Sequence, residues 1–377
     1  MGDPYWLDEP APRLPAAEWT GRPDVVVVGG GITGCSCALT LARHGMRVRV
    51  HEARRVAHGA SGRNGGFALR GGAMPYDRAR EWLGPDAARA YWQWTERALE
   101  RLAALGGDAV RRGGSLRLAA DQAEREELRA EFEVLRADGF DAAWREELDA
   151  PLTDRFAAAI FHPPDAALQP ARLVRLLAVA AAEAGADIRE GSRVSSIAGV
   201  DADHVVVATD GYPSGLLGEL EGLIVPTRGQ MLATEPVPER LFDLPHYGRH
   251  GYDYWHQAPD GSMLVGGFRD ASLADEFTAE EATTEAIQSS LERFVRDLLG
   301  RPVRVTHRWA GIFGLVPDLM PVVGPLPGRE RAWVAGGYSG HGNVLGFGCG
   351  ELVARAILGA TDPMLELMRP ARLLEPA

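Results

Sequence analysis

The spacing of hydrophobic and polar residues changes along the chain, and its first part marks a strand, a helix and a second strand. Residues 25–28 are four consecutive valines, an apolar run typical of a parallel strand buried on both faces. Residues 32–44 place their apolar side chains at helical intervals, and residues 48–52 indicate another strand that ends on an acid. This order predicts a βαβ unit.

The rest of the chain repeats these patterns and adds a third one. In residues 223–233 and again in 262–265, apolar and polar residues alternate, which predicts antiparallel strands. Residues 5–23, rich in Pro and Trp, are expected to form an arm on the surface. Further helices are predicted at 82–106, 121–138, 170–184, 278–299 and 343–358, and further strands at 187–189, 194–197, 204–208, 303–309 and 333–335.

A glycine turn joins the first predicted strand to the first helix. Gly29, Gly31 and Gly34 form a GxGxxG pattern, in which bare glycines let the backbone approach a pyrophosphate at the positive end of the helix. Glu52 ends the second strand, where a carboxylate accepts hydrogen bonds from a ribose 2′-hydroxyl. This arrangement predicts a dinucleotide site, with a tight turn that binds nothing as the alternative. Further contacts are expected from Ile32, Thr33, Ala53 and Arg54.

The cofactor is decided by two more glycine-rich stretches, since the acid at residue 52 argues against NADP but leaves NAD and FAD open. Residues 58–66 follow the second strand and add the side chains of Ser61 and Asn64 to many free N–H groups. Residues 336–342 lie between a strand and the last helix. FAD is longer than NAD and has use for three such loops, so the pattern favours FAD.

Motifs from residue 25 to about 358 resemble those of the D-amino-acid-oxidase superfamily of flavin amine oxidases. That superfamily includes glycine oxidase, monomeric sarcosine oxidase and γ-glutamylputrescine oxidoreductase, and the motifs are most similar to those of the last. The motifs are GGGITG at 29–34, GASGRNGG at 59–66, VVVATDGY at 205–212, PTRGQMLATEP at 226–236, RWAG at 308–311, PD at 317–318, PVVG at 321–324 and GGYSGHG at 336–342.

The resemblance implies an α/β fold with an FAD-binding Rossmann-like domain of the glutathione-reductase type and an antiparallel-sheet substrate domain. The 377 residues suit two domains. The FAD-binding domain is expected to be discontinuous. It is predicted to comprise residues 22–80, 165–215 and 305–377, and the substrate domain residues 81–164 and 216–304.

The resemblance also implies where the parts of FAD lie. Val194 would pack by the adenine, and the loop at 336–342 would direct the last helix at the flavin, where its dipole stabilises negative charge. Relatives that tether FAD use a Cys or a His at places that here hold the residues around Gly311 and Asn64, so FAD is expected to be non-covalent. The other expected contacts are Ala60, Ser61, Arg63, Gly65, Gly66, Ala208, Thr209, Gly211, Gly340, His341, Gly342, Asn343 and Val344.

Two substrate anchors of the superfamily are missing from this chain. Phe313 stands where amino-acid-oxidising relatives have an Arg for the substrate carboxylate, and Val344 stands where sarcosine-type enzymes have a Lys. An amine without an α-carboxylate is therefore favoured, although Arg70 leaves amino acids open. Tyr252, Tyr254 and His256 are candidates for an aromatic cage around an alkylammonium, with core packing as the alternative.

The resulting hypothesis is an FAD-dependent oxidoreductase. It would oxidise the C–N bond of a primary or secondary amine to an imine by hydride transfer to flavin N5, with O₂ giving H₂O₂. The alternatives are an amino-acid oxidase acting on glycine, sarcosine or a D-amino acid, a flavin-holding subunit without independent turnover, and an NAD dehydrogenase. The acceptor stays open because relatives place a Lys near N5 and this chain has none, which leaves His256, His341 or Arg269 as replacements.

Composition restricts the partners. The balance of 40 basic and 52 acidic residues gives a net charge of −12, which argues against nucleic acid. All the basic residues are Arg, so Schiff-base chemistry on a lysine is excluded. Three cysteines without a pairing pattern, no metal-binding motif and no long apolar run predict a cytoplasmic protein without a metal or a membrane span.

Overall fold

The four valines form β1 (Val25–Val28), which lies inside a mainly parallel sheet. The computed structural model describes residues 3–212 and 215–374 of the chain. Val25 stands opposite Val48 on one side and His204 on the other. The order of the six-stranded sheet is β16 (Val322–Leu326), β17 (Arg329–Gly336), β10 (His204–Val207), β1, β2 (Val48–His51) and β9 (Asp187–Arg189).

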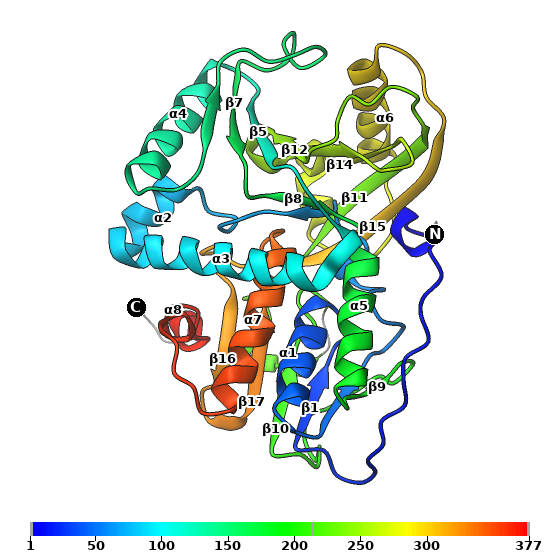
Figure 1. The fold of residues 1–377 in the computed structure, drawn as a ribbon, viewed down its shortest axis with the longest axis vertical. Coiled ribbons are helices and arrows are strands. Elements are labelled where there is room, and N and C mark those ends of the chain that lie inside the picture. Colours follow the sequence, from blue (N-terminus) through cyan, green and yellow to red (C-terminus); the bar gives the residue numbers. More distant parts are fainter. Residues whose placement is uncertain (1–2, 213–214, 375–377) are drawn as a thin grey trace.

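Three helices lie together against this sheet: α1 (Ile32–Arg43), α5 (Pro170–Glu183) and α7 (Gly342–Ile357) (Figure 1). Glycines in α7 allow it to approach α1 closely. A Cβ atom at Gly350 would lie 2.4 Å from the carbonyl oxygen of Thr33, and one at Gly346 would lie 2.8 Å from Thr33 Oγ1. The first turn of α1 is therefore held directly against α7.

The segment predicted as a strand at residues 194–197 is not a strand. Its neighbour β9 already forms the edge of the sheet beside β2, and the backbone N–H of Ser192 donates to the carbonyl of Glu52, so no ladder continues into the segment. Its apolar side chains still contribute to packing. Val194 and Ile197 lie against a cluster that contains residues of β1 and β10.

The second sheet holds the predicted antiparallel strands. Strands β11 and β15 pair along their length, from Val225 opposite Leu315 to Thr234 opposite Val305. The order of this eight-stranded sheet is β15 (Val305–Leu315), β11 (Val225–Pro236), β14 (Ser262–Gly267), β13 (Asp253–Gln257), β12 (His246–Gly248), β5 (Ser115–Ala119), β7 (Ala158–His162) and β6 (Ala143–Arg145). The sequence assigned residues 305–377 to the FAD-binding domain, whereas β15, which begins at Val305, pairs with β11 in the second sheet.

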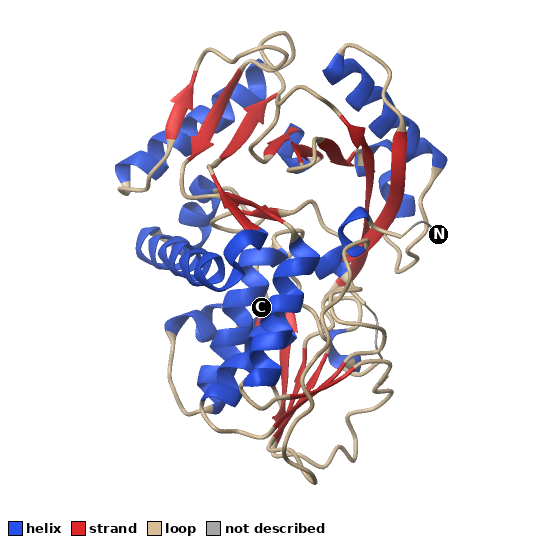
Figure 2. Ribbon diagram, turned by 45° about the vertical axis from the view of Figure 1, so that its right-hand side comes forward, coloured by secondary structure: helices blue, strands red, loops and turns tan. Residues whose placement is uncertain are grey.

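The two sheets lie in opposite parts of the molecule, with helices between them and around them (Figure 2). Helix α3 runs across the middle, where it contacts α7 and α5 (Figure 1). The remaining elements are β3 (Phe67–Ala68), β4 (Val110–Arg112), β8 (Ala166–Leu168), α2 (Tyr76–Leu83), α3 (Pro85–Gly106), α4 (Gln122–Ala137), α6 (Glu285–Leu299), α8 (Pro363–Leu367) and α9 (Ala371–Leu374). This is the predicted α/β class with a mainly antiparallel second sheet, in which β12 and β5 pair in parallel.

Two helix predictions need correction. The pattern at 82–106 extends across α2 and α3, which are separate because Gly84 has a left-handed φ of 84° that ends one helix before the next begins. The helix predicted from residue 278 begins only at Glu285. Residues 278–284 before it have no helical structure.

The N-terminal arm was predicted to lie on the surface, but part of it is buried. Tyr5–Leu7 form a short helical turn, and Trp6 in it is only 2% exposed. The indole of Trp6 lies among residues of the core, so the arm is part of the fold. Among the described residues, none of the helices has the length and apolar character that a membrane crossing requires.

Candidate flavin and substrate site

A cavity of about 440 Å³ opens at the carboxyl ends of β1 and β2, above the N-terminus of α1. The glycines beside it have no room for a side chain. Gly29 has a φ of 114°, and a Cβ there would lie 2.5 Å from the carbonyl oxygen of Ala208; a Cβ at Gly34 would lie 1.9 Å from the carbonyl oxygen of Gly29. The turn therefore packs tightly and presents the helix N-terminus, a site suited to a pyrophosphate.

Glu52 lines this cavity and fixes its shape. Its carboxylate accepts hydrogen bonds from the backbone N–H of Gly30 at 2.8 Å and of Arg54 at 2.7 Å. Each oxygen keeps a further lone pair, as a ribose hydroxyl requires. On the other side of the turn, Ser61 Oγ accepts the N–H of Ile32 at 3.0 Å, which joins the second glycine loop to α1.

Asp210 connects three loops around the cavity and was missed at the level of sequence. One carboxylate oxygen accepts the N–H of Gly314 at 3.0 Å, and the other accepts the N–H of Gly337 at 2.8 Å. Burial raises the pKa of Asp210, although these backbone hydrogen bonds act in the opposite direction. Its φ of 48° is a conformation that Asp tolerates better than most residues, which is the signal that the ATDG motif contained.

The extended segment before α6 crosses the mouth of the cavity. Ala279 and Glu281 line it, and the Glu281 carboxylate pairs with Arg54 at 2.7 Å and accepts a hydrogen bond from the Tyr212 hydroxyl at 2.5 Å. Burial alone would raise the pKa of Glu281, but Arg54 and Tyr212 lower it below its ordinary value. These two contacts of Glu281, called the clasp below, hold the segment to the part of the molecule, or lobe, that contains the first sheet.

A second cavity of about 450 Å³ adjoins the first one. Asn64 and Asn343 stand at the junction, where Asn343 Nδ2 donates to Asn64 Oδ1 at 3.0 Å and to the carbonyl of Phe67 at 2.8 Å. The residues that line both cavities are Ala60, Asn64, Phe313, Gly340 and Asn343. A long cofactor with one end in each cavity fits this arrangement.

The family model described as "FAD dependent oxidoreductase" matches residues 24–356. The chain belongs to this family. Its cofactor is therefore FAD, for which the narrow glycine turn, the carboxylate of Glu52 and the two joined cavities provide a fitting site. Non-covalent binding is usual in the family.

Known proteins extend this assignment. Gamma-glutamylputrescine oxidoreductase of Escherichia coli (strain K12) is 28% identical over 90% of this chain and 84% of its own, and glycine oxidase of Bacillus licheniformis is 27% identical over 90% and 94%. The crystal structure of L-proline dehydrogenase from P. horikoshii has a TM-score of 0.77 at 22% identity and covers 96% of this chain and 98% of its own. The last shows a shared fold. The first two relatives, with the family model, support the superfamily resemblance and an enzyme that acts on amines or amino acids.

The structure divides the predicted FAD residues into three groups. Those that line the FAD cavity are Gly29, Gly31, Ile32, Thr33, Glu52, Ala53, Arg54, Ala60, Ser61, Asn64, Val194, Ala208, Thr209, Gly340, Gly342 and Asn343. Arg63, Gly65, Gly311 and His341 line the second cavity instead. Gly34, Gly66, Gly211 and Val344 line neither cavity; Val344 is buried in α7, and the three glycines lie where neighbouring backbone leaves no room for a Cβ.

The second cavity has aromatic walls, as the sequence suggested. Tyr252, Tyr254 and Phe313, all predicted substrate contacts, line it. Burial raises the pKa of Tyr254 to about 12, so its hydroxyl is protonated at neutral pH. Phe67 packs edge-on against Tyr254 with ring centroids 6.0 Å apart. The cavity therefore offers flat apolar surfaces with a hydroxyl donor.

His256, another predicted substrate contact, does not line the second cavity. Its side chain is buried, stacks on Trp6 with ring centroids 5.9 Å apart, and has Nε2 3.0 Å from the carbonyl oxygen of Gly65. Burial lowers the pKa of His256 to about 3, so the ring is neutral and donates from Nε2. Strand alternation places Tyr254 and His256 on the same face, opposite to Trp255. The difference comes from the loop of Gly65, whose carbonyl His256 contacts.

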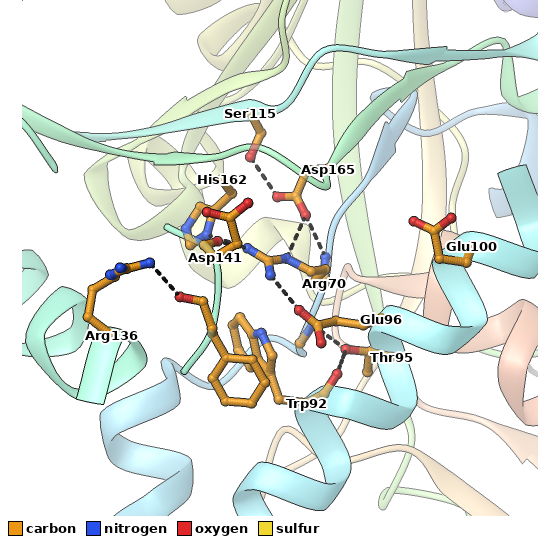
Figure 3. A network of polar contacts seen from close by, with 12 residues as sticks. Arg70, Trp92, Thr95, Glu96, Glu100, Ser115, Arg136, Asp141, His162 and Asp165 are labelled. Atoms are coloured by element: carbon orange, nitrogen blue, oxygen red, sulfur yellow. Dashed lines mark hydrogen bonds and ion pairs between the residues drawn. The ribbon is translucent and has the colours of Figure 1, made fainter. Parts of the chain in front are cut away.

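Arg70 does not line the second cavity either. Its guanidinium pairs with Glu96 at 2.6 Å, approaches Asp165 at 3.4 Å and donates to the carbonyl of Asp141 at 2.7 Å (Figure 3). The side chain is only 1% exposed. Burial raises the pKa of Asp165 to about 6 against the influence of Arg70. Arg70 is thus a structural residue that joins α3 to the strands, and its partners leave no place for a substrate carboxylate.

The surroundings of Arg269 differ from those of Arg70. It lines the second cavity, half-buried, with its guanidinium carbon 4.8 Å from the ring centroid of Tyr252 and 5.6 Å from that of Phe313. Among the described residues, no carboxylate lies within ion-pair distance of it. At the level of sequence, Arg269 was considered only as a replacement for the lysine that relatives use in flavin reoxidation. Nothing in the sequence around an Arg after a strand indicates that it lacks an acidic partner.

Proposed function

We propose that this flavoprotein oxidises the C–N bond of an amine that also carries a carboxylate, and converts that bond to an imine. The unpaired guanidinium of Arg269 in the second cavity is the observation that supports this substrate class. A planar guanidinium between two aromatic rings is held in one orientation, which suits a carboxylate that binds through both oxygens. FAD supplies the hydride acceptor when it is bound.

The charges around the second cavity agree with this substrate class. Arg63, Arg117 and Arg269 line it, and no Asp or Glu belongs to its lining among the described residues. Arg117 is neutralised by its ion pair with Glu131, and Arg63 lies 3.6 Å from Glu281. Arg269 therefore leaves a net positive charge in the cavity, which disfavours a second ammonium group and favours an anion.

The chain's other residues orient the substrate and exclude water. The rings of Tyr254 and Phe313 form the wall beside Asn64 and Asn343, where the two cavities meet. Among the described residues no carboxylate lines this wall, so no acidic side chain there can act as a base on the amine. The amine is expected to react in its neutral form, and the protein contributes position.

Two relatives are consistent with a carboxylate-bearing amine. The names of the E. coli and B. licheniformis relatives specify γ-glutamylputrescine and glycine. Both molecules have an oxidisable amine and a carboxylate, separated by very different distances. An amine such as γ-glutamylputrescine and an amino acid such as glycine therefore share the need for a cationic group that binds the carboxylate. Arg269 is the residue proposed for this role.

Matched substrate pairs test the proposal by anaerobic bleaching of the flavin band. The pairs are glycine against methylamine, sarcosine against dimethylamine, and γ-glutamylputrescine against putrescine. We expect bleaching by the carboxylate-bearing member of at least one pair and none by its partner. Equal or faster bleaching by the members without a carboxylate would refute the substrate class.

A second candidate, an amine without a carboxylate, is favoured by Phe313 and Val344 at the superfamily's two anchor positions. The same panel identifies it through its carboxylate-free members. No bleaching by any amine would favour the flavin-holding subunit instead. Peroxide release from the active pair, compared with reduction of an artificial dye in the absence of oxygen, then separates an oxidase from a dehydrogenase.

A further inference from the structure

Three consecutive backbone carbonyls of the second glycine loop accept hydrogen bonds from buried aromatic side chains. The carbonyl of Arg63 accepts from Trp309 Nε1 at 2.8 Å, that of Asn64 from Trp6 Nε1 at 2.7 Å, and that of Gly65 from His256 Nε2 at 3.0 Å. We call these three side chains the aromatic clamp. Trp6 and Trp309 are each no more than 2% exposed, and His256 is equally buried.

Such a set of donors fixes the direction of a loop. Each carbonyl is turned toward the core by a ring N–H whose own side chain is packed on all sides. Burial lowers the pKa of His256 to about 3, so its Nε2 keeps a proton that can be donated to Gly65. Trp6 stacks on His256 with an interplanar angle of 21°, so the two donors also hold each other. An unpaired carbonyl at any of the three positions would be unfavourable.

The donor Trp6 comes from the other end of the sequence from Trp309 and His256. It belongs to the N-terminal arm, which other contacts fix in place. Gln169 Nε2 donates to the carbonyl of Trp6 at 3.0 Å, and Arg172 pairs with Glu9 at 2.8 Å. The arm is thus attached to the start of α5 at Trp6 itself and at Glu9, three residues further along the chain.

The loop that the clamp holds stands at the junction of the FAD cavity and the substrate cavity. Asn64 lines both cavities, and its Oδ1 accepts the N–H of Gly66 at 2.9 Å as well as the Nδ2 of Asn343. A rotation of the peptide at Asn64 would move this side chain and break its pairing with α7. None of the clamp residues lines either cavity, so their influence passes through the loop backbone.

We propose that Trp6 is a positioning residue of the FAD site, which acts through the carbonyl of Asn64 to hold the loop at residues 63–66 ready for the cofactor. The N-terminal arm therefore supports the cofactor site from outside: none of its described residues lines the cavity, and it acts through the loop backbone. A protein that lacks the indole N–H spends part of its free energy of FAD binding on ordering the loop, so its affinity is lower.

The substitution Trp6→Phe tests this proposal, because phenylalanine keeps a ring beside His256 and removes the N–H. Trp19→Phe is the matched control: Trp19 lies in the same arm and donates to the carbonyl of Gly185 at 2.7 Å, but Gly185 is not part of the FAD site. His256→Phe removes a second donor of the clamp. The dissociation constant of FAD, from flavin fluorescence, and the melting temperature of the apoprotein are measured for each purified variant.

We expect Trp6→Phe and His256→Phe each to raise the dissociation constant of FAD by about tenfold and to change the fine structure of the visible flavin band. Trp19→Phe should leave both properties as in the wild type, while its apoprotein melts at a temperature similar to that of Trp6→Phe. Unchanged FAD affinity in both clamp variants would overturn the proposal. So would an equal loss of affinity in Trp19→Phe, which would indicate general destabilisation. If Trp6→Phe does not fold, His256→Phe decides alone.

Discussion

Single residues decide which substrate the second cavity accepts, and Arg269 is the most informative of them. Its guanidinium stacks over Tyr252 and Phe313, so one face of each ring is already covered by a cation. The aromatic cage expected from the sequence for an alkylammonium therefore holds an arginine instead. This position of the charge supports the proposed binding of a carboxylate although Phe313 and Val344 replace the superfamily's anchors.

The first prediction concerns Arg269. Arg269→Gln should raise KM for the best carboxylate-bearing substrate by about 10- to 100-fold, the usual effect of losing hydrogen bonds to a charged group, with a smaller effect on kcat. Arg269→Lys keeps the charge but loses the planar guanidinium, so its KM should lie between those of the wild type and of Arg269→Gln. The carboxylate-free partner of the same substrate is the internal control. A KM that is unaffected in both variants would remove Arg269 from the substrate site.

At the scale of an element, the extended segment before α6 behaves as a strap over the FAD cavity. Glu281 in this strap is held by Arg54 and Tyr212 of the opposite lobe. The sequence predicted that residues 278–284 would belong to the helix. Helical periodicity carries no information about contacts with distant loops, such as those of Glu281 with Arg54 and Tyr212. The strap thus connects the second sheet's part of the molecule to Arg54 and Tyr212, which line the FAD cavity.

The second prediction tests the strap. Glu281→Ala should speed FAD release from the holoprotein by about tenfold, because the substitution removes a partly buried ion pair and a hydrogen bond together. Release is followed by the rise in flavin fluorescence after dilution. Glu280→Ala changes the exposed neighbour in the same strap and should release FAD at the wild-type rate. Identical rates in the two variants would show that the clasp does not retain the cofactor.

The third prediction concerns the packing of α1 on α7. Gly350→Ala places a methyl group 2.4 Å from the carbonyl oxygen of Thr33, so one of the helices has to move. The expected cost is about 2 kcal/mol, which for a chain of 377 residues corresponds to a fall in Tm of roughly 2–3 °C. Gly218→Ala is the control, since no atom lies within 4 Å of a Cβ there. An equal Tm for both variants would mean that the helices are not in direct contact at Gly350.

At the scale of the whole molecule, buried histidines make stability depend on pH. Burial lowers the pKa of His246 to about 4, of His256 to about 3 and of His341 to about 4, from an ordinary value of 6.5. The unfolded chain therefore binds these protons at a higher pH than the folded protein does. The stability that the neutral rings provide is complete above pH 6.5 and is lost as pH falls toward 4.

The fourth prediction follows from this linkage. At pH 5.5 each of the three histidines should have reduced the free energy of unfolding by about 1 kcal/mol relative to pH 7.5, so Tm should fall between these values. His246→Phe, far from the FAD residues in the stack on Trp255, should reduce the difference in unfolding free energy between the two pH values. His44→Phe, on the surface, is the control. If His246→Phe leaves the difference in unfolding free energy between pH 5.5 and 7.5 unchanged, His246 does not contribute to the pH dependence of stability.

The sequence by itself determined the chemistry of the cofactor and the class of the fold. The glycine turn at residues 29–34 with Glu52, and the loops at 59–66 and 336–342, are local patterns whose backbone requirements appear in residue type. The valine run and the alternating strands are equally local. These features could be predicted because hydrophobic period and bare glycine act over a few neighbouring residues.

Only the tertiary structure decided which side chains were already engaged. Arg70 and Arg269 are chemically the same residue, yet Arg70 is surrounded by Glu96 and Asp165, whereas Arg269 has no carboxylate beside it in the part of the chain that the structure describes. Likewise Trp6 became part of the FAD site through a hydrogen bond to a residue 58 positions away. Whether a polar group is free to bind a ligand depends on partners brought together by folding, and neither spacing nor composition records those partners.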